Sequence, residues 1–258
     1  MGVGPYTVRS NVRRGPYATI TVEGRVEPSK PGQFYMVRGD WGADPLLGRP
    51  LSILSDDPSQ GVLRFLLKIF GEGSRRLHEL EPGQKVHALG PLGRPFPRGA
   101  AERGGKPALV GGGVGVPPLV YLAEAFAREG RSFSFLQGAR TKDDLVCLEE
   151  LAALGVQPEV TTEDGSEGER GLVTAPLKRA IEMGAPVVYA CGPEGMLKAV
   201  AALCRGRVPS YLSLEARMAC GYGVCLGCVV PVVRDGVRSY ERVCQEGPVF
   251  EGEVVEWP

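Results

Sequence analysis

The stretch Leu109-Val110-Gly111-Gly112-Gly113-Val114-Gly115-Val116-Pro117-Pro118-Leu119 decides the fold of this chain. A short apolar run leads into a glycine-rich loop, and the loop leads into a segment of helical length. A glycine run at the carboxyl end of the first strand of a parallel sheet is where dinucleotide phosphates bind. Prolines suit the first turn of the helix that follows. A tight packing turn is the alternative, because the loop is not Gly-x-Gly-x-x-Gly.

The segments around this loop alternate between strand-like and helix-like patterns. We expect strands at 107–110, 132–136, 157–162 and 186–190, and helices at 119–128, 143–154, 174–183 and 195–204. Such alternation predicts a parallel, doubly wound sheet. A second glycine loop, at residues 189–196, follows the strand at 186–190 and therefore lies at the same edge of the sheet as the first loop. A dinucleotide is therefore expected at Gly111, Gly112, Gly113, Gly115, Cys191, Gly192 and Pro193, and the family resemblance described below implies that it is a nicotinamide nucleotide.

The first 100 residues have the pattern of a small antiparallel barrel, with short strands separated by Gly/Pro turns. Strand patterns occur at 17–26, 34–37, 51–54, 62–70 and 85–89. Within this region Pro50 fixes the backbone, so that Leu51 and Ser52 point to opposite faces. Arg49 could then clamp a pyrophosphate and Ser52 could hydrogen-bond a flavin ring edge. A surface arginine before a strand is the alternative.

Seven cysteines are present, and an odd number argues against a disulfide framework. Cys147, Cys191 and Cys204 lie singly in apolar surroundings and are expected in the core. The other four follow the plant-type [2Fe–2S] spacing, with glycines between the ligands: Cys220-x4-Cys225-x2-Cys228-x15-Cys244. Zinc and four free thiols are the alternatives, although zinc sites usually pair two Cys-x2-Cys knuckles. The last gap leaves room for one hairpin that turns at Asp235-Gly236.

Composition excludes several function classes. Thirty basic residues balance thirty acidic ones, which argues against nucleic-acid binding through bulk charge. No apolar run approaches the roughly 20 residues of a membrane helix, and the start lacks a signal-peptide pattern, so we expect a cytoplasmic protein. No Ser/His/Asp set is visible, which excludes hydrolysis and leaves no catalytic acid or base to assign.

These patterns predict an α+β multi-domain protein with three parts. The expected parts are an N-terminal antiparallel β-barrel over 1–100, a central doubly wound parallel α/β sheet over 101–208, and a small C-terminal [2Fe–2S] domain over 209–258.

The motifs together resemble a known superfamily. Arg-Pro-Leu-Ser at 49–52, the glycine loop at 111–119 and Cys-Gly-Pro-Glu-Gly-Met at 191–196 are similar to the ferredoxin–NADP reductases. The runs at 215–228 and 242–250 resemble the electron-transfer subunits of NAD-dependent, two-subunit dihydroorotate dehydrogenases. This resemblance implies that Cys220, Cys225, Cys228 and Cys244 bind the cluster, and that FAD is held by Arg49, Pro50, Leu51, Ser52, Leu66, Leu67, Lys68, Gly73 and Ser74.

The resemblance also implies a function. Electrons from dihydroorotate, oxidised on an FMN-containing catalytic partner subunit, would pass through the [2Fe–2S] cluster and FAD to NAD+ in de novo pyrimidine biosynthesis. The assembly would be a heterotetramer. The alternatives are a reductase subunit of a hydrogenase, glutamate-synthase or bifurcating ferredoxin–NADP oxidoreductase complex, and a non-catalytic zinc-bearing interaction protein. Arg140, after the second strand, could contact the 2′-phosphate of NADP, so only the resemblance favours NAD.

Overall fold

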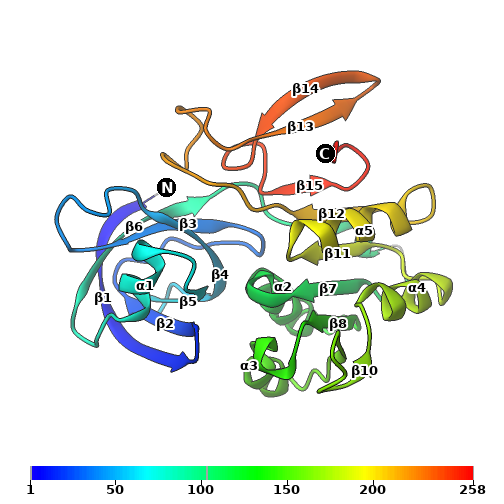
Figure 1. Cartoon of the computed structure of the whole chain (residues 1–258), viewed down its shortest axis with the longest axis horizontal. Coiled ribbons are helices and arrows are strands. Elements are labelled where there is room, and N and C mark those ends of the chain that lie inside the picture. The colour runs from blue at the N-terminus through cyan, green and yellow to red at the C-terminus, as the bar shows by residue number, and fades with distance from the viewer. Residues whose placement is uncertain (1, 103, 258) are drawn as a thin grey trace.

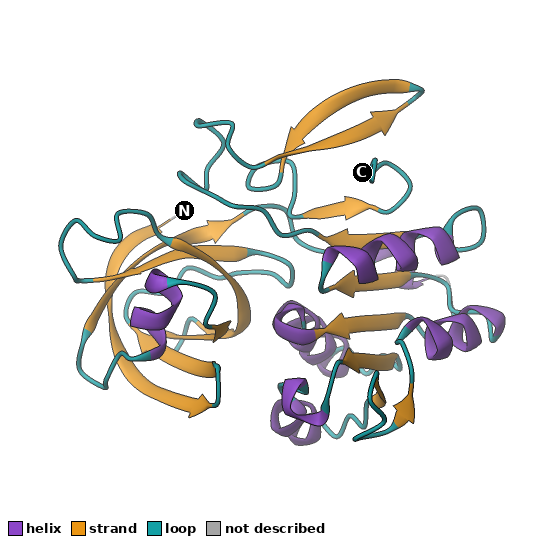
Figure 2. Ribbon diagram, in the orientation of Figure 1, coloured by secondary structure: helices purple, strands orange, loops and turns teal. Residues whose placement is uncertain are grey.

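The computed structural model describes residues 2–102 and 104–257. Figures 1 and 2 show three parts: a β-barrel formed by the N-terminal third, an α/β layer beside it, and a C-terminal segment that lies above both. The predicted fold class is confirmed by this architecture. Within the described residues, no helix is both long and apolar enough to cross a bilayer.

Six antiparallel strands close the barrel in the order β1-β2-β5-β4-β3-β6. Strand β2 has the alternation expected of a barrel strand. Its buried residues Ala18, Ile20 and Val22 alternate with half-buried Thr19 and Thr21. The barrel elements are β1 (Gly2–Arg14), β2 (Tyr17–Glu23), β3 (Phe34–Gly39), β4 (Arg49–Asp57), β5 (Val62–Lys68), α1 (Glu72–His78) and β6 (Lys85–Leu92).

The longest barrel strand, β1, has no counterpart among the strand patterns of the sequence. Glycines and Pro5 interrupt its alternation, and its register with β2 shifts between Val8 and Ser10. Its position rests on tertiary pairing instead, because it hydrogen-bonds both β2 and β6 and so closes the barrel.

The second part is a seven-stranded sheet in the order β10-β9-β8-β7-β11-β12-β15, in which only β15 is antiparallel to its neighbour. Its strands are β7 (Ala108–Gly112), β8 (Ser134–Ala139), β9 (Glu159–Thr162), β10 (Glu169–Arg170), β11 (Val188–Cys191), β12 (Ser210–Ser213) and β15 (Val249–Glu251). Its helices and short turns are η1 (Gly99–Glu102), η2 (Gly113–Gly115), α2 (Pro117–Arg128), η3 (Lys142–Asp144), α3 (Leu148–Ala153), α4 (Thr174–Glu182) and α5 (Glu194–Cys204).

Helices cover both faces of this sheet. On β7, Ala108 and Val110 belong to the core cluster that includes α4 and α5, whereas Leu109 belongs to the cluster that includes α2 and α3. A parallel strand that is buried on both faces is apolar throughout, which explains the run in the sequence. The predicted doubly wound arrangement is therefore present.

The helix expected at 143–154 is divided into η3 and α3. Between them Cys147 adopts a left-handed backbone with φ 60°. The buried Gln137 side chain donates a hydrogen bond of 2.9 Å to the carbonyl of Val146. This side chain takes the place of a helical backbone partner, and the helix restarts only at Leu148.

The C-terminal residues contribute to two sheets. Strands β12 and β15 extend the seven-stranded sheet, and the chain between them carries the hairpin β13 (Val229–Arg234) and β14 (Val237–Arg242). Asp235 and Gly236 form the predicted turn, with φ 51° and 77°. In Figure 1 this hairpin projects from the top of the molecule.

Candidate functional site

The two glycine loops of the sheet pack directly against each other. A Cβ atom on Gly115 would lie 2.5 Å from the backbone nitrogen of Gly192, and one on Gly112 would lie 2.7 Å from the sulfur of Met196. Side chains at these positions would push the loops apart. The structure thus brings together the two loops that the sequence placed at one sheet edge.

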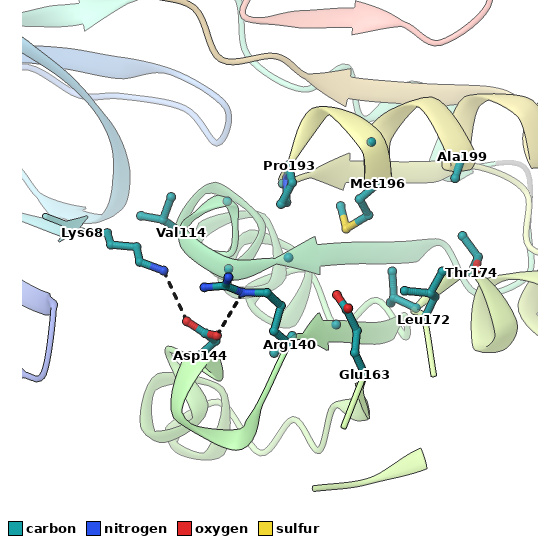
Figure 3. Close-up of a pocket in the computed structure, with 18 of the residues that line it drawn as sticks. Lys68, Val114, Arg140, Asp144, Glu163, Leu172, Thr174, Pro193, Met196 and Ala199 are labelled. Carbon is teal, nitrogen blue, oxygen red and sulfur yellow. Dashed lines mark hydrogen bonds and ion pairs between the residues drawn. The ribbon is translucent and has the colours of Figure 1, made fainter. Parts of the chain in front are cut away.

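Beside these loops lies a cavity of about 590 Å³, which we call the sheet-edge cavity (Figure 3). Five of the residues predicted for the nicotinamide nucleotide line it, namely Gly112, Gly113, Gly115, Gly192 and Pro193. The other two, Gly111 and Cys191, are buried behind its wall. Its remaining lining includes the ends of β8 and β9, the start of α4, α5, Asp144 of η3, Glu215 after β12, and the barrel.

A second cavity of about 440 Å³, the barrel cavity, lies between the barrel and the chain that follows β12. Of the residues predicted for FAD, only Gly73 does not line it; the lining includes Arg49, Pro50, Leu51, Ser52, Leu66, Leu67, Lys68 and Ser74. Gly73 has a different part, since a Cβ there would lie 2.0 Å from the guanidinium carbon of Arg49. The arginine therefore rests against the first turn of α1.

The two cavities meet. Four residues line both of them: Lys68, Phe70, Val114 and Glu215. Only Lys68 was predicted from the sequence. Glu215 is exposed at the junction of the two cavities. The protein around its carboxylate still desolvates it in part, and this raises the pKa of Glu215. Glu215 begins the run that carried the family resemblance and Val114 lies within the first glycine loop, and these signals could have marked both residues, whereas Phe70 only ends a strand pattern.

A polar bridge joins the barrel to the α/β layer at the edge of the sheet-edge cavity. Tyr17 Oη donates a hydrogen bond of 2.7 Å to Asp144 Oδ1, and Lys68 Nζ donates to the same tyrosine oxygen at 2.9 Å. Lys68 Nζ lies 3.3 Å from Asp144 Oδ1, and Arg140 Nε lies 3.6 Å from Asp144 Oδ2 (Figure 3). Asp144 thereby engages both cationic side chains of the cavity.

The four spaced cysteines lie in and beside a loop of residues 219–228, the cysteine loop. Burial alone raises the pKa of Cys220, but the backbone N–H groups of Cys225 and Tyr222 point at its sulfur and lower the pKa to about 6. The N–H of Cys244 donates to Cys228 Sγ at 3.4 Å. Inward N–H groups of this kind suit thiolate sulfur and bridging sulfide.

The four thiols lie close enough to interact with one another. Cys220 interacts with Cys225, and Cys244 interacts with Cys228 and with Cys220. In residues 2–102 and 104–257, no three His, Cys, Asp or Glu side chains converge on one point as the ligands of a single metal ion do. A [2Fe–2S] cluster takes two protein ligands on each iron. Four neighbouring thiols that do not converge on one point therefore fit this cluster better than a tetrahedral zinc site.

The cysteine loop lies against the barrel. A Cβ on Gly221, whose φ is +79°, would lie 2.4 Å from Met36 Cγ on β3. Met218, two residues before Cys220, lines the barrel cavity. The barrel cavity and the first cysteine are therefore neighbours along one short piece of chain.

The remaining cysteines are core residues, as predicted. Cys147, Cys191 and Cys204 are all buried, and burial raises the pKa of each thiol. They are protonated at neutral pH and separate from the cysteine loop, which makes them suitable internal controls.

Two family models match the chain. Residues 109–202 match the oxidoreductase NAD-binding domain, and residues 215–256 match the iron–sulfur cluster binding domain of dihydroorotate dehydrogenase B. The solved structure of an NADH-dependent reduced ferredoxin–NADP oxidoreductase, studied for flavin-based electron bifurcation, is similar, with a TM-score of 0.85 and 28% identity over 98% of this chain and 90% of that one. The cytochrome b5 reductase domain of Ulva prolifera nitrate reductase shares the fold, with a TM-score of 0.63 and 17% identity.

The fold and the site define an iron–sulfur oxidoreductase with a nicotinamide-nucleotide domain. The electron transfer subunit of dihydroorotate dehydrogenase B (NAD(+)) from Bacillus caldolyticus is 44% identical over 92% of this chain and 91% of the relative. The corresponding subunit of Shouchella clausii is 39% identical over 96% and 95%. This chain belongs to the family of dihydroorotate dehydrogenase B electron transfer subunits.

Proposed function

We propose that this chain passes electrons, derived from dihydroorotate on an FMN-containing partner subunit, through a [2Fe–2S] cluster and FAD to NAD+ in pyrimidine biosynthesis. The observation that carries this proposal is one continuous piece of chain. Residues 213–218 line the barrel cavity, and Glu215 among them also lines the sheet-edge cavity. Cys220 lies two residues after Met218. Three cofactor sites in this order form a relay.

The order matches what each group can carry. A [2Fe–2S] cluster passes single electrons, a nicotinamide accepts a hydride, and FAD exchanges electrons in both ways. The chain itself holds these groups in place and shields them. Its barrel cavity lies between the other two sites, because it shares Glu215 with the sheet-edge cavity and Met218 leads to the cysteine loop.

FAD would occupy the barrel cavity. Arg49 lies against the first turn of α1, where a guanidinium can pair with a pyrophosphate. Ser74 accepts hydrogen bonds from the N–H groups of Phe70 and Gly71 and so fixes the turn before α1. The remaining contacts would come from Pro50, Leu51, Ser52, Leu66, Leu67, Lys68 and Gly73.

NAD would occupy the sheet-edge cavity. The glycines of the two packed loops leave the backbone open to a pyrophosphate at the start of α2, where the helix dipole favours negative charge. The assigned residues are Gly111, Gly112, Gly113, Gly115, Cys191, Gly192 and Pro193. Gly111 and Cys191 act from behind the wall by permitting the close packing.

The cluster would be bound by Cys220, Cys225, Cys228 and Cys244. Anaerobic purification followed by iron and sulfide analysis and visible absorption tests this assignment. We expect about two irons and two sulfides per chain, and flavin and cluster bands that bleach with NADH. Cys228→Ser should remove the cluster bands and keep the flavin bands, whereas the matched control Cys204→Ser should keep both. Zinc without iron in the native chain would overturn the assignment.

The partner would be an FMN-containing catalytic subunit, and the assembly a heterotetramer of two copies of each chain. The relatives are named as electron transfer subunits, which supports a separate chain for the substrate chemistry. Co-expression with the catalytic subunit and light-scattering mass measurement test the stoichiometry. A stable complex with the mass of only one copy of each chain would contradict the heterotetramer. The odd number of thiols favours a reducing compartment, and we place the complex in the cytoplasm.

A further inference from the structure

The direction of a dinucleotide in the sheet-edge cavity follows from the two ends of that cavity. One end meets the barrel cavity at Lys68, Phe70 and Glu215. The nicotinamide must lie there, because hydride transfer requires contact with the flavin. The pyrophosphate lies at the glycine loop after β7. The adenosine ribose then lies beyond the pyrophosphate, away from the flavin, along the ends of β8 and β9, where Arg140 and Glu163 line the cavity.

The charged side chains that line the whole sheet-edge cavity are unevenly paired. The charged residues that line the cavity are two basic and three acidic: Lys68, Arg140, Asp144, Glu163 and Glu215. Both basic side chains pair with Asp144. Among the described residues no ion pair or hydrogen bond engages the Glu163 carboxylate, which points into the cavity in Figure 3.

The backbone holds Glu163 in this place. Its N–H donates a hydrogen bond of 3.1 Å to the carbonyl of Ala139, and the N–H of Asp164 donates to the carbonyl of Arg140 at 3.2 Å. The chain segments that follow β8 and β9 are thereby joined, and the backbone of Glu163 is held next to that of Arg140. In dinucleotide-binding sheets a carboxylate beside the adenosine ribose accepts a hydrogen bond from its 2′-hydroxyl, whereas an arginine there receives a 2′-phosphate.

We propose that Glu163 selects NAD over NADP. Its carboxylate accepts a hydrogen bond from the 2′-hydroxyl of the adenosine ribose and repels a 2′-phosphate, while Asp144 keeps Arg140 from serving as a phosphate clamp. This inference rests on the proposed binding of NAD in the sheet-edge cavity. It also explains why Arg140, which in the sequence left the choice between NAD and NADP open, need not bind a 2′-phosphate: its guanidinium pairs with Asp144.

Calorimetric titration of the full chain with ADP-ribose and with 2′-phospho-ADP-ribose tests the proposal, because neither probe carries a nicotinamide that could react. We expect ADP-ribose to bind at least about tenfold more tightly. Glu163→Gln should reduce this preference to within about threefold, because the repelling charge is gone. Glu163→Arg should reverse it in favour of the phosphorylated probe.

Glu167→Gln is the matched control, because Glu167 is exposed in the same loop and does not line the cavity. It should keep the wild-type preference. Equal binding of both probes to the native chain, or an unchanged preference in Glu163→Gln with an unaltered melting temperature, would overturn the role of Glu163 and leave the NAD site standing. If neither probe binds, the sheet-edge cavity is not a dinucleotide site and both proposals fail.

Discussion

Gly115 of the sheet-edge cavity is tightly confined by backbone atoms. The nearest atoms to its missing Cβ belong to the backbone of Cys191 and Gly192, and backbone cannot rotate away as a side chain can. We expect Gly115→Ala to separate the two loops, to lower the free energy of unfolding by about 1–3 kcal/mol, and to weaken ADP-ribose binding at least about tenfold. Urea denaturation and calorimetry measure the two effects.

Gly99→Ala is the control for this substitution, since no atom lies within 4 Å of its missing Cβ and its φ is not in the left-handed region. It should change neither quantity measurably. Full nucleotide affinity in Gly115→Ala would show that the close contact of the loops is not needed for binding.

Local spacing explains which single residues could be predicted. The glycines of the two loops and the four spaced cysteines carry their signal within a few positions of chain. Asp144 does not, because its importance comes from partners far away in sequence. Asp144 meets Tyr17 across 127 positions, and no pattern around either residue records that contact.

Among the elements, the bridge between β2, β5 and η3 is the polar tie that borders the sheet-edge cavity. Burial alone would raise the pKa of Asp144, but hydrogen bonds from Tyr17 and Lys68 hold it below its usual value. A carboxyl whose pKa is lowered in the folded state stabilises the fold above its unfolded pKa and loses that effect as the pH falls through the folded pKa.

We expect Asp144→Asn to lower the free energy of unfolding by about 1–2 kcal/mol at neutral pH, since Asp144 is only partly buried. The difference from the native chain should shrink as the pH falls below about 4. Denaturation at a series of pH values measures it. Asp143→Asn, one residue away and exposed, should show no such difference at any pH. A constant deficit in Asp144→Asn down to pH 3 would contradict the ionic origin.

Periodicity predicted most elements of the α/β layer and failed where tertiary contacts override it. The expected helix at 143–154 breaks at Cys147 because a buried glutamine side chain, Gln137, bonds the backbone there. Strand β1 was missed because its pairing partners, and not its own alternation, make it a strand. Both exceptions depend on residues outside the segment itself.

For the whole molecule, the division at residue 208 stays a prediction. Residues 209–258 supply β12 and β15 to the large sheet, and Leu212 and Phe250 are buried in its core. A chain that ends at residue 208 would lose both side chains, each contributing about 1.5–3 kcal/mol, and would expose β11 as an edge strand. We expect this truncated chain to aggregate or to melt well below the native chain, as circular dichroism and light scattering would measure.

A matched variant keeps the two strands and removes the chain between them. Ser213 and Val249 are register partners in the antiparallel pair of β12 and β15, so a two-residue turn can replace residues 214–248. This variant should fold with an intact sheet, although it lacks the four spaced cysteines and one wall of the barrel cavity. A well-folded chain ending at 208 would instead support an independent C-terminal domain.

The pairing of β12 with β15 bears on ancestry as well. The N–H of Leu214 donates to the carbonyl of Pro248 at 2.8 Å, so the chain enters and leaves the cysteine-bearing excursion at almost the same point. An insertion with adjacent ends disturbs its host little. A flavin reductase with a plain hairpin at this sheet edge could therefore have gained its iron–sulfur relay in a single genetic event, without any change to the strands on either side.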